Sequence, residues 1–173
     1  MLNRPEPKIS VLFVCLGNIC RSPMAEGAFR AAAEKAGLEV RVDSVGTASY
    51  HIGENPDPRA IETARRHGVD ISAATGRQLS DDDFTNFTHI FALDKANLAG
   101  INARAPGRST AKIALLLDVV EGREGEAVPD PYYGEMAGFE ACWQTISEAV
   151  EVAVMQLCDK GASSVQYASG PDV

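Results

Sequence analysis

Short apolar runs alternate with helical stripes along the first part of the chain. Residues 9–14 form a β-branched run that predicts a buried strand. After a loop, apolar residues recur at helical spacing, and Gly37 follows them as a helix-ending residue. The recurring positions are Ala25, Ala28, Phe29, Ala32 and Ala36. With a second strand expected near residues 40–45, the pattern predicts a strand, a helix and a strand in succession.

The alternation of strands and helices continues towards the end of the chain. Residues 89–93 and 112–117 predict a third and a fourth strand. Further helix starts are signalled by capping residues, at Ser22-Pro23, at Asp57-Pro58, at residues 80–83 and at Asp94, whose helix runs to about Arg104. A long amphipathic helix follows the Gly- and Pro-rich loop 119–134. Its apolar stripe consists of Phe139, Cys142, Trp143, Ile146, Val150 and Leu157.

This order of elements predicts the fold class. Repeated β-α alternation is typical of a single α/β domain, here a four-stranded parallel sheet with helices on both faces. Ligands of such sheets bind at the carboxyl ends of the strands. The domain is expected to span residues 8–160. Residues 161–173 are rich in Ser, Gly and Ala without periodicity, which predicts a disordered tail.

Composition and charge narrow the function classes. The 173 residues include 16 Lys and Arg against 24 Asp and Glu, so the formal net charge is −8. This field repels nucleic acids and anionic membranes, and we expect neither nucleic-acid binding nor membrane insertion. No apolar run approaches the roughly 20 residues that span a bilayer, and the N-terminus shows no signal sequence, so we expect a cytoplasmic protein. Four cysteines are too few for a disulfide scaffold.

The loop after the first predicted strand carries candidate chemistry. It reads Cys15-Leu16-Gly17-Asn18-Ile19-Cys20-Arg21-Ser22 and enters a helix. Backbone N–H groups in such a loop form an anion nest, and the helix N-terminus adds its dipole. These dipoles and the guanidinium of Arg21 are expected to lower the pKa of Cys15 from about 8.5 towards a range of roughly 3.5–7.5. Arg21 is also suited to grip a phosphoryl group through two parallel hydrogen bonds.

A second candidate segment lies in the loop after the fourth predicted strand. Asp130-Pro131-Tyr132-Tyr133-Gly134 offers a carboxylic acid that could protonate the leaving oxygen of a phosphate ester. The neighbouring aromatic rings could form the wall of a pocket. Together, the two loops predict a phosphate-binding loop with a nucleophile, a clamp and an acid.

The two segments resemble the low-molecular-weight protein tyrosine phosphatases. The shared features are C-x-x-x-x-x-R-S near the N-terminus and D-P-Y-Y about 115 residues later, and the similarity covers about residues 8 to 160. The resemblance implies hydrolysis of phosphotyrosine monoesters through a cysteinyl-phosphate intermediate. In this reaction Cys15 is the nucleophile, Arg21 the phosphate clamp and Asp130 the general acid and then base. It implies neither a metal nor another cofactor.

The resemblance also assigns the residues around the reacting atoms. Ser22 would donate to the leaving thiolate, Asn18 would hold the shape of the loop, and Ser44 and Asp94 would support the site. The substrate contacts that it implies are Leu16, Gly17, Asn18, Ile19, Cys20, Ser22, Tyr50 and Tyr132. Tyr132 and Tyr133 match family sites of regulatory phosphorylation. The implied partners are phosphotyrosine proteins or small aryl phosphates, and a tyrosine kinase of the same pathway.

The sequence departs from the family pattern at one position. The family usually has a histidine before Arg77-Gln78 that supports the network beneath the loop, and here Ala74 or a neighbour stands there. A buried water or a rearranged partner is expected to replace the imidazole.

Several alternatives remain beside these assignments. Ser22 and Asp94 could instead be simple helix caps. Cys15 and Cys20 could be half of a zinc site, but Cys142 and Cys158 lie far along the chain and no histidine pair is nearby. The spacing of His51, His67 and His89 matches no triad or metal motif, so no catalytic role is expected for them.

Two other functions compete with the phosphatase. An arsenate reductase of the same fold needs two further cysteines near residues 75 to 95, where the chain has none. A binding module without turnover should lack the nucleophile or the acid. Members that act on phosphoarginine carry Thr at the position of Ile19, so Ile19 favours an aryl ester. Cys20 is expected to form a reversible disulfide with an oxidised Cys15.

Overall fold

The molecule is built on a four-stranded parallel sheet with the order β2-β1-β3-β4. The structure, a computed structural model, describes residues 5–160. The strands are β1 (Ser10–Cys15), β2 (Arg41–Gly46), β3 (His89–Ala92) and β4 (Lys112–Leu115). Because β1 pairs with β2 on one side and β3 on the other, its carboxyl end lies at the point where the strand order reverses.

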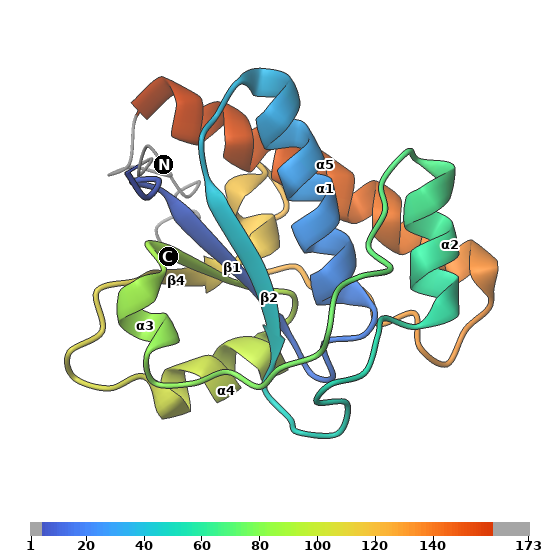
Figure 1. Cartoon of the computed structure of the whole chain (residues 1–173), viewed down its shortest axis with the longest axis horizontal. Helices are drawn as coiled ribbons and strands as arrows, with labels where there is room; N and C mark the ends of the chain where they lie inside the picture. The colour runs from blue at the N-terminus through green and yellow to red at the C-terminus, as the bar shows by residue number, and fades with distance from the viewer. Residues whose placement is uncertain (1–4, 161–173) are drawn as a thin grey trace.

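Helices cover both faces of this sheet, as the sequence predicts (Figure 1). The alternation of side chains along β1 supplies the two cores, since Phe13 points to one face and Leu12 to the other. The Phe13 face packs against α1 (Arg21–Ala36), α2 (Pro58–Arg66) and α5 (Met136–Lys160). The Leu12 face packs against α3 (Asp83–Asn86) and α4 (Lys95–Arg104).

Most of the predicted element ends are confirmed. Gly37 ends α1 in a left-handed conformation with φ of 71°. Asp57 caps α2 by accepting a hydrogen bond from the Arg59 amide at 2.8 Å, with Pro58 as the first helical residue. Asp94 caps α4 by accepting from the Asn97 amide at 2.7 Å. The predicted apolar stripe of α5 is buried at every position.

Two predicted boundaries are wrong. The first helix begins at Arg21, so Ser22 is not its cap and Pro23 is its third residue. The hydroxyl of Ser22 is turned towards the loop instead. The fourth strand ends at Leu115, because Leu116–Val119 form a 3₁₀ helix. Leu116 and Leu117 are buried in this 3₁₀ helix, as a buried strand would also require, so the apolar pattern does not distinguish the two conformations.

Two other expectations concern membrane-spanning helices and the C-terminal tail. Within residues 5–160, no helix combines the length and apolar character needed to cross a bilayer. The tail predicted at residues 161–173 lies outside the described residues.

Candidate active site

The phosphate-binding loop predicted after β1 runs from Cys15 to Cys20 and passes directly into α1. The amides of Thr47 and Ala48 donate to the carbonyls of Cys15 and Leu16 at 2.9 and 3.0 Å, which ties the loop to the end of β2. This approach requires a glycine at position 46, because a Cβ there would lie 2.7 Å from the Leu16 carbonyl oxygen. The sheet therefore fixes the loop on one side and the helix fixes it on the other.

The Cys15 sulfur lies on the concave side of this loop. Its Sγ accepts a hydrogen bond from the Asn18 amide at 3.3 Å and lies 3.0 Å from the Ser22 hydroxyl. Among residues 5–160, the backbone N–H groups of Gly17, Ile19 and Cys20 donate no hydrogen bond to a backbone or side-chain acceptor. These N–H groups and the helix dipole are the components of an anion nest, in which negative charge on sulfur or on a phosphate is stabilised.

Asn18 holds the loop from behind. It has a positive φ of 58°, and its side-chain amide nitrogen donates to the hydroxyls of Ser22 and Ser44 at 2.8 and 3.0 Å. Its amide oxygen accepts from the Arg77 backbone at 3.1 Å. Both ends of the Asn18 side chain thus have hydrogen-bond partners, and none of the partners within the described residues is a histidine.

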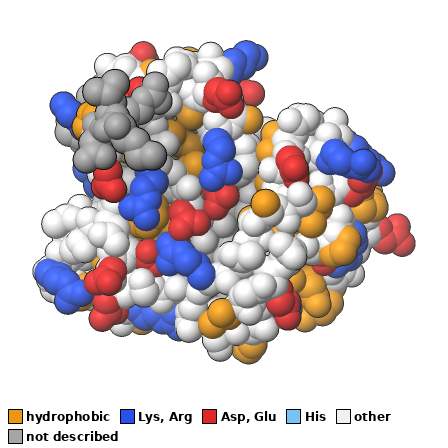
Figure 2. Space-filling model, in the orientation of Figure 1, with side chains coloured by type: hydrophobic (Ala, Val, Ile, Leu, Met, Phe, Trp, Pro, Cys, Tyr) orange, Lys and Arg blue, Asp and Glu red, His pale blue; other side chains and the backbone are white. Residues whose placement is uncertain are grey.

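A cavity of about 340 Å³ lies behind this network, lined in part by Ala74. Acidic and basic side chains alternate over β2 on this face of the molecule (Figure 2). Glu26, which lines the cavity, is buried, and this burial raises the pKa of its carboxyl, although the 3.1 Å ion pair with Arg30 opposes the shift. Ala74, at or near the place where the resemblance puts a histidine, therefore lies beside a polar hollow.

Arg21 is held so that its guanidinium faces the pocket. Its Nη1 donates to the Asp94 carboxylate at 2.7 Å and to the Val128 carbonyl at 2.9 Å, and its side chain is only 4% exposed. Its Nη2 lies 3.7 Å from the Asp130 carboxylate. Asp94 therefore both caps α4 and anchors Arg21, so the two roles that the sequence left as alternatives coexist.

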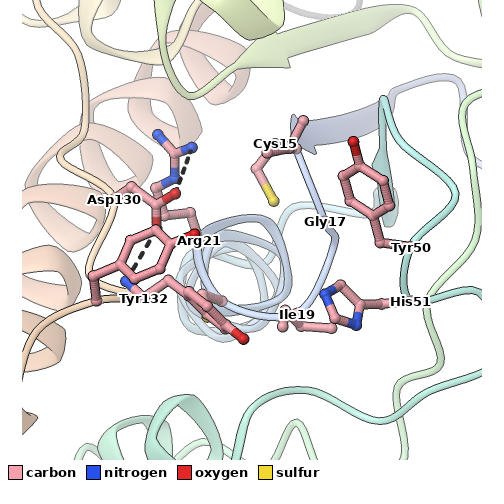
Figure 3. A pocket seen from close by; sticks show the side chains of 11 residues that line it. Cys15, Gly17, Ile19, Arg21, Tyr50, His51, Asp130 and Tyr132 are labelled. Carbon is pink, nitrogen blue, oxygen red and sulfur yellow. Dashed lines mark hydrogen bonds and ion pairs between the residues drawn. The ribbon is translucent and has the colours of Figure 1, made fainter.

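Asp130 and two aromatic rings complete a pocket of about 240 Å³ (Figure 3). Asp130 accepts from the Tyr132 amide at 3.1 Å, and its side chain is 44% exposed. In Figure 3 the Cys15 sulfur points into the pocket, with Tyr50 on one side and Tyr132 with Asp130 on the other. A phosphate in contact with Cys15 and Arg21 would thus lie beneath two rings and within reach of an acid.

The structure brings most of the predicted site residues to this pocket. Those that line it are Cys15, Leu16, Gly17, Ile19, Cys20, Arg21, Tyr50, Asp130 and Tyr132. Asn18 and Ser22 do not line it, because their side chains bond to each other behind the loop. Ser44 also lies behind the loop, in contact with Asn18.

Sequence reasoning assigned no role at the pocket to two nearby residues, His51 and Arg59. His51 lines the pocket and is paired with Glu54 at 2.6 Å, and Tyr133, whose ring was expected to wall a pocket, also lines it. Arg59 donates to the carbonyls of Tyr132 and Gly134 at 2.9 and 2.8 Å. Arg59 directly follows the Asp57-Pro58 helix start, so its place there was the available signal. The spacing of His51 gave no signal, because a loop path brings it to the site.

The cysteines differ in their surroundings. Cys15, Cys20 and Cys142 are buried, Cys158 is exposed, and all four are free thiols. Burial raises the pKa of Cys20 far above its usual range, and the carboxylate of Asp57 adds to the shift. In residues 5–160, no three His, Cys, Asp or Glu side chains form a group that could hold a metal ion.

Comparisons with known proteins show the family and the fold of this chain. Residues 10–163 match the family model described as low molecular weight phosphotyrosine protein phosphatase. A protein of this description from Schizosaccharomyces pombe is 49% identical over 138 residues, which cover 78% of this chain and 88% of that protein. The crystal structure of YfkJ from Bacillus subtilis matches with a TM-score of 0.83 at 40% identity, over 92% of this chain and 99% of that chain. YwlE from the same species, described as an arginine phosphatase, matches with a TM-score of 0.81 at 26% identity, over 88% and 98%.

Proposed function

Because the chain belongs to the low molecular weight phosphotyrosine protein phosphatase family, we propose that it hydrolyses phosphotyrosine monoesters through a cysteinyl-phosphate intermediate. One observation carries the proposal: the sulfur of Cys15 lies in an anion-binding loop that shares one pocket with Arg21 and Asp130. A pocket with this set of groups provides a nucleophile, a clamp and an acid for one phosphorus atom.

In the first step the thiolate of Cys15 attacks phosphorus. A sulfur–phosphorus bond forms while the bond from phosphorus to the ester oxygen breaks. The leaving phenolic oxygen keeps the electron pair and takes the proton of the Asp130 carboxylic acid. Arg21 and the loop amides bind the equatorial oxygens, where negative charge is concentrated in the transition state. Asp94 and the Val128 carbonyl hold the guanidinium in the orientation that this binding needs.

In the second step a water molecule replaces the departed phenol. The Asp130 carboxylate takes a proton from the water, whose oxygen attacks phosphorus as the sulfur–phosphorus bond breaks. The electron pair of that bond returns to Cys15, where the Ser22 hydroxyl at 3.0 Å and the Asn18 amide at 3.3 Å stabilise the thiolate. Phosphate is released, and Asp130 holds the proton for the next cycle.

The depth and walls of the pocket favour a long, flat substrate side chain. Tyr50 and Tyr132 rise beside the loop, so a phosphoryl group must be carried past two rings to reach Cys15 (Figure 3). Phosphotyrosine has this reach, and phosphoserine is too short. Phosphoarginine is a second candidate, because the YwlE match is described as an arginine phosphatase. Ile19 lines the pocket with an apolar side chain, which gives a guanidino nitrogen no hydrogen bond and favours the aryl ester.

This activity also suggests where the enzyme acts and which proteins it meets. We infer that the unit spanning residues 8–160 acts in the cytoplasm on phosphotyrosine proteins or small aryl phosphates. A tyrosine kinase of the same pathway would supply these substrates. The same kinase class could modify Tyr132 and Tyr133, whose residues are 39% and 95% exposed.

Substitution of the nucleophile tests the proposal. The Cys15→Ser variant should lose turnover but keep the binding of vanadate, because serine is not ionised at neutral pH while the loop and Arg21 remain. Phosphate release would be measured from matched phosphotyrosine, phosphoserine and phosphoarginine peptides. Cys158→Ser is the control, because that exposed thiol lies on α5 outside the pocket. Near-normal turnover by Cys15→Ser would refute the mechanism, and a higher kcat/KM for phosphoarginine than for phosphotyrosine would refute the substrate class.

A further inference from the structure

We propose that Arg59 is a positioning residue that sets the distance between the phosphate-binding loop and the loop that carries Asp130. The inference rests on the proposed function, in which Asp130 is the general acid. Arg59 lies in the N-terminal turn of α2, outside both loops, and it does not line the pocket. It therefore acts through Asp130 and does not touch the substrate.

The loop of Asp130 has few other attachments. On its upstream side, the Val128 amide donates to the Leu93 carbonyl at 2.8 Å, and the Val128 carbonyl accepts from Arg21. On its downstream side, within the described residues, the hydrogen bonds from other parts of the molecule come from Arg59. Asp130 therefore lies between the attachments to Leu93 and Arg21 on one side and the attachment to α2 on the other.

Arg59 makes the downstream attachment with both nitrogens of its guanidinium fork. Its Nη1 donates to the Gly134 carbonyl at 2.8 Å and its Nη2 to the Tyr132 carbonyl at 2.9 Å. The guanidinium carbon also lies 5.7 Å from the centroid of the Tyr132 ring and 4.6 Å from that of the Phe139 ring. These contacts fix both Asp130, whose carboxylate accepts from the Tyr132 amide, and the aromatic wall of the pocket.

The opposite side of the guanidinium is anchored to the phosphate-binding loop through Asp57. The Asp57 carboxylate accepts from Nε and Nη2 of Arg59 at 3.0 and 2.9 Å, and the Arg59 hydrogen bonds hold the pKa of Asp57 below its usual range. The Asp57 amide in turn donates to the Ile19 carbonyl at 2.8 Å. A continuous path of hydrogen bonds thus runs from the loop of Cys15, through Asp57 and Arg59, to the loop of Asp130.

This geometry needs an arginine. The fork reaches one carboxylate and two carbonyl oxygens at once, whereas the single ammonium of lysine cannot occupy all three positions. A displacement of about 1 Å in a catalytic group can cost on the order of a hundredfold in rate. Loss of Arg59 should therefore impair the proton transfer by Asp130 and leave the attack by Cys15 largely intact.

The test separates these two steps by the leaving group. The measured quantity is kcat/KM for aryl phosphates that range from dinitrophenyl phosphate to phenyl phosphate, because kcat/KM covers the steps up to phenol release and only poor leaving groups need the proton there. Asp130→Asn is the reference, and its kcat/KM should fall by roughly 10²–10⁴ for phenyl phosphate and much less for dinitrophenyl phosphate. Arg59→Ala should show the same selective loss at about ten- to a hundredfold, and Arg59→Lys should not restore activity.

The double variant and a control on the same helix complete the design. In the Asp130→Asn background, Arg59→Ala should add no further leaving-group dependence, because the group through which it acts is gone. Arg66→Ala removes the same charge from α2, where Arg66 pairs with Glu62, and should leave the profile unchanged. Arg59→Gln, which keeps an amide donor, serves in the same assays if Arg59→Ala does not fold.

Two outcomes would overturn the inference in different ways. If Asp130→Asn shows the selective loss and the Arg59 variants lower kcat/KM equally for all substrates, or add to Asp130→Asn, the positioning role is wrong and the proposed function stands. If Asp130→Asn itself shows no dependence on the leaving group, the acid assignment of the proposed function is wrong, and the role of Arg59 falls with it.

Discussion

At the scale of single residues, the site depends on side chains that each do two things. Asn18 satisfies both its amide nitrogen and its oxygen within the network and also adopts the positive φ that curves the loop. Asp94 caps α4 and anchors Arg21. The sequence predicted that Cys15 and Arg21 share one pocket, because residue type and spacing place both on the loop after β1. It did not predict the bond from the Arg77 amide to Asn18, because no periodic pattern records such a contact.

Cys20 provides a prediction at this scale. Peroxide should convert the reactive thiolate of Cys15 to a sulfenic acid, while Cys20, whose pKa is raised by burial, stays a thiol. The Cys20 sulfur then attacks the sulfenic sulfur, the new S–S bond replaces the S–O bond, and water leaves. After peroxide treatment, dithiothreitol should restore the activity of the wild type.

The matched variant for this test is Cys20→Ala, with Cys142→Ala as the control for loss of another buried thiol. Cys20→Ala should lose activity irreversibly and show sulfinic acid at Cys15 by mass spectrometry. Equal recovery of wild type and Cys20→Ala would mean that Cys20 only fills space beside the loop.

At the scale of elements, the sequence located the helices and strands but not all of their ends. Asp57-Pro58 begins α2 and Gly37 ends α1, and both predictions are confirmed. Ser22-Pro23 carries the same kind of signal, yet α1 begins before it. The Ser22 hydroxyl is bonded to Asn18 and lies beside Cys15, so the requirements of the site overrode the local preference.

Glycines in two helices give a prediction about packing at this scale. A Cβ at Gly27 would lie 2.6 Å from Cγ2 of Ile71 and 2.9 Å from Cγ1 of Val69, both on stiff β-branched side chains. The gain in helix propensity from Gly27→Ala, at most about 1 kcal/mol, is therefore outweighed by overpacking of about 1–3 kcal/mol. At Gly138 in α5, the nearest atom to an added Cβ is 3.9 Å away.

Urea unfolding of the two alanine variants should therefore give opposite signs. Gly27→Ala should lower the free energy of unfolding by about 1 kcal/mol, whereas Gly138→Ala should raise it by a few tenths or more. A stabilised Gly27→Ala would show that α1 and the segment at residues 69–71 separate at little cost, contrary to the close contact seen here.

At the scale of the whole molecule, the parallel sheet explains how distant segments converge. Cys15 ends β1, and Asp94 and Asp130 follow β3 and β4 along the chain, so their side chains gather at one edge of the sheet. This convergence was predictable from β-α alternation alone. The contribution of Arg59 was not, because it depends on how the irregular loop before α5 folds back onto α2. The same edge favours an anion despite a net charge of −8, since loop amides and Arg21 determine the local field.

The sheet also contains a buried group that should make global stability depend on pH. His89, the first residue of β3, is fully buried, its Nδ1 lies 2.8 Å from the Thr88 hydroxyl, and its Nε2 has no hydrogen-bond partner within the described residues. Burial lowers the pKa of His89 to about 4, and the charge of Lys112 adds to the shift. Between about pH 4 and pH 6.5, the unfolded chain, whose histidine pKa is about 6.5, therefore binds a proton that the folded chain does not bind.

The sign of the effect follows from this difference. Stability from a neutral His89 is fully present above about pH 6.5 and is lost as the pH falls towards 4, by about 2–3 kcal/mol at pH 4.5. Urea unfolding at pH 7 and pH 4.5 should show that His89→Gln loses less stability than the wild type by this amount, because carboxylates that titrate in both proteins cancel. His67→Gln, which changes a partly exposed histidine on the edge of α2, should retain the wild-type loss. An unchanged loss in His89→Gln would mean that the sheet admits a protonated imidazole at this position without cost.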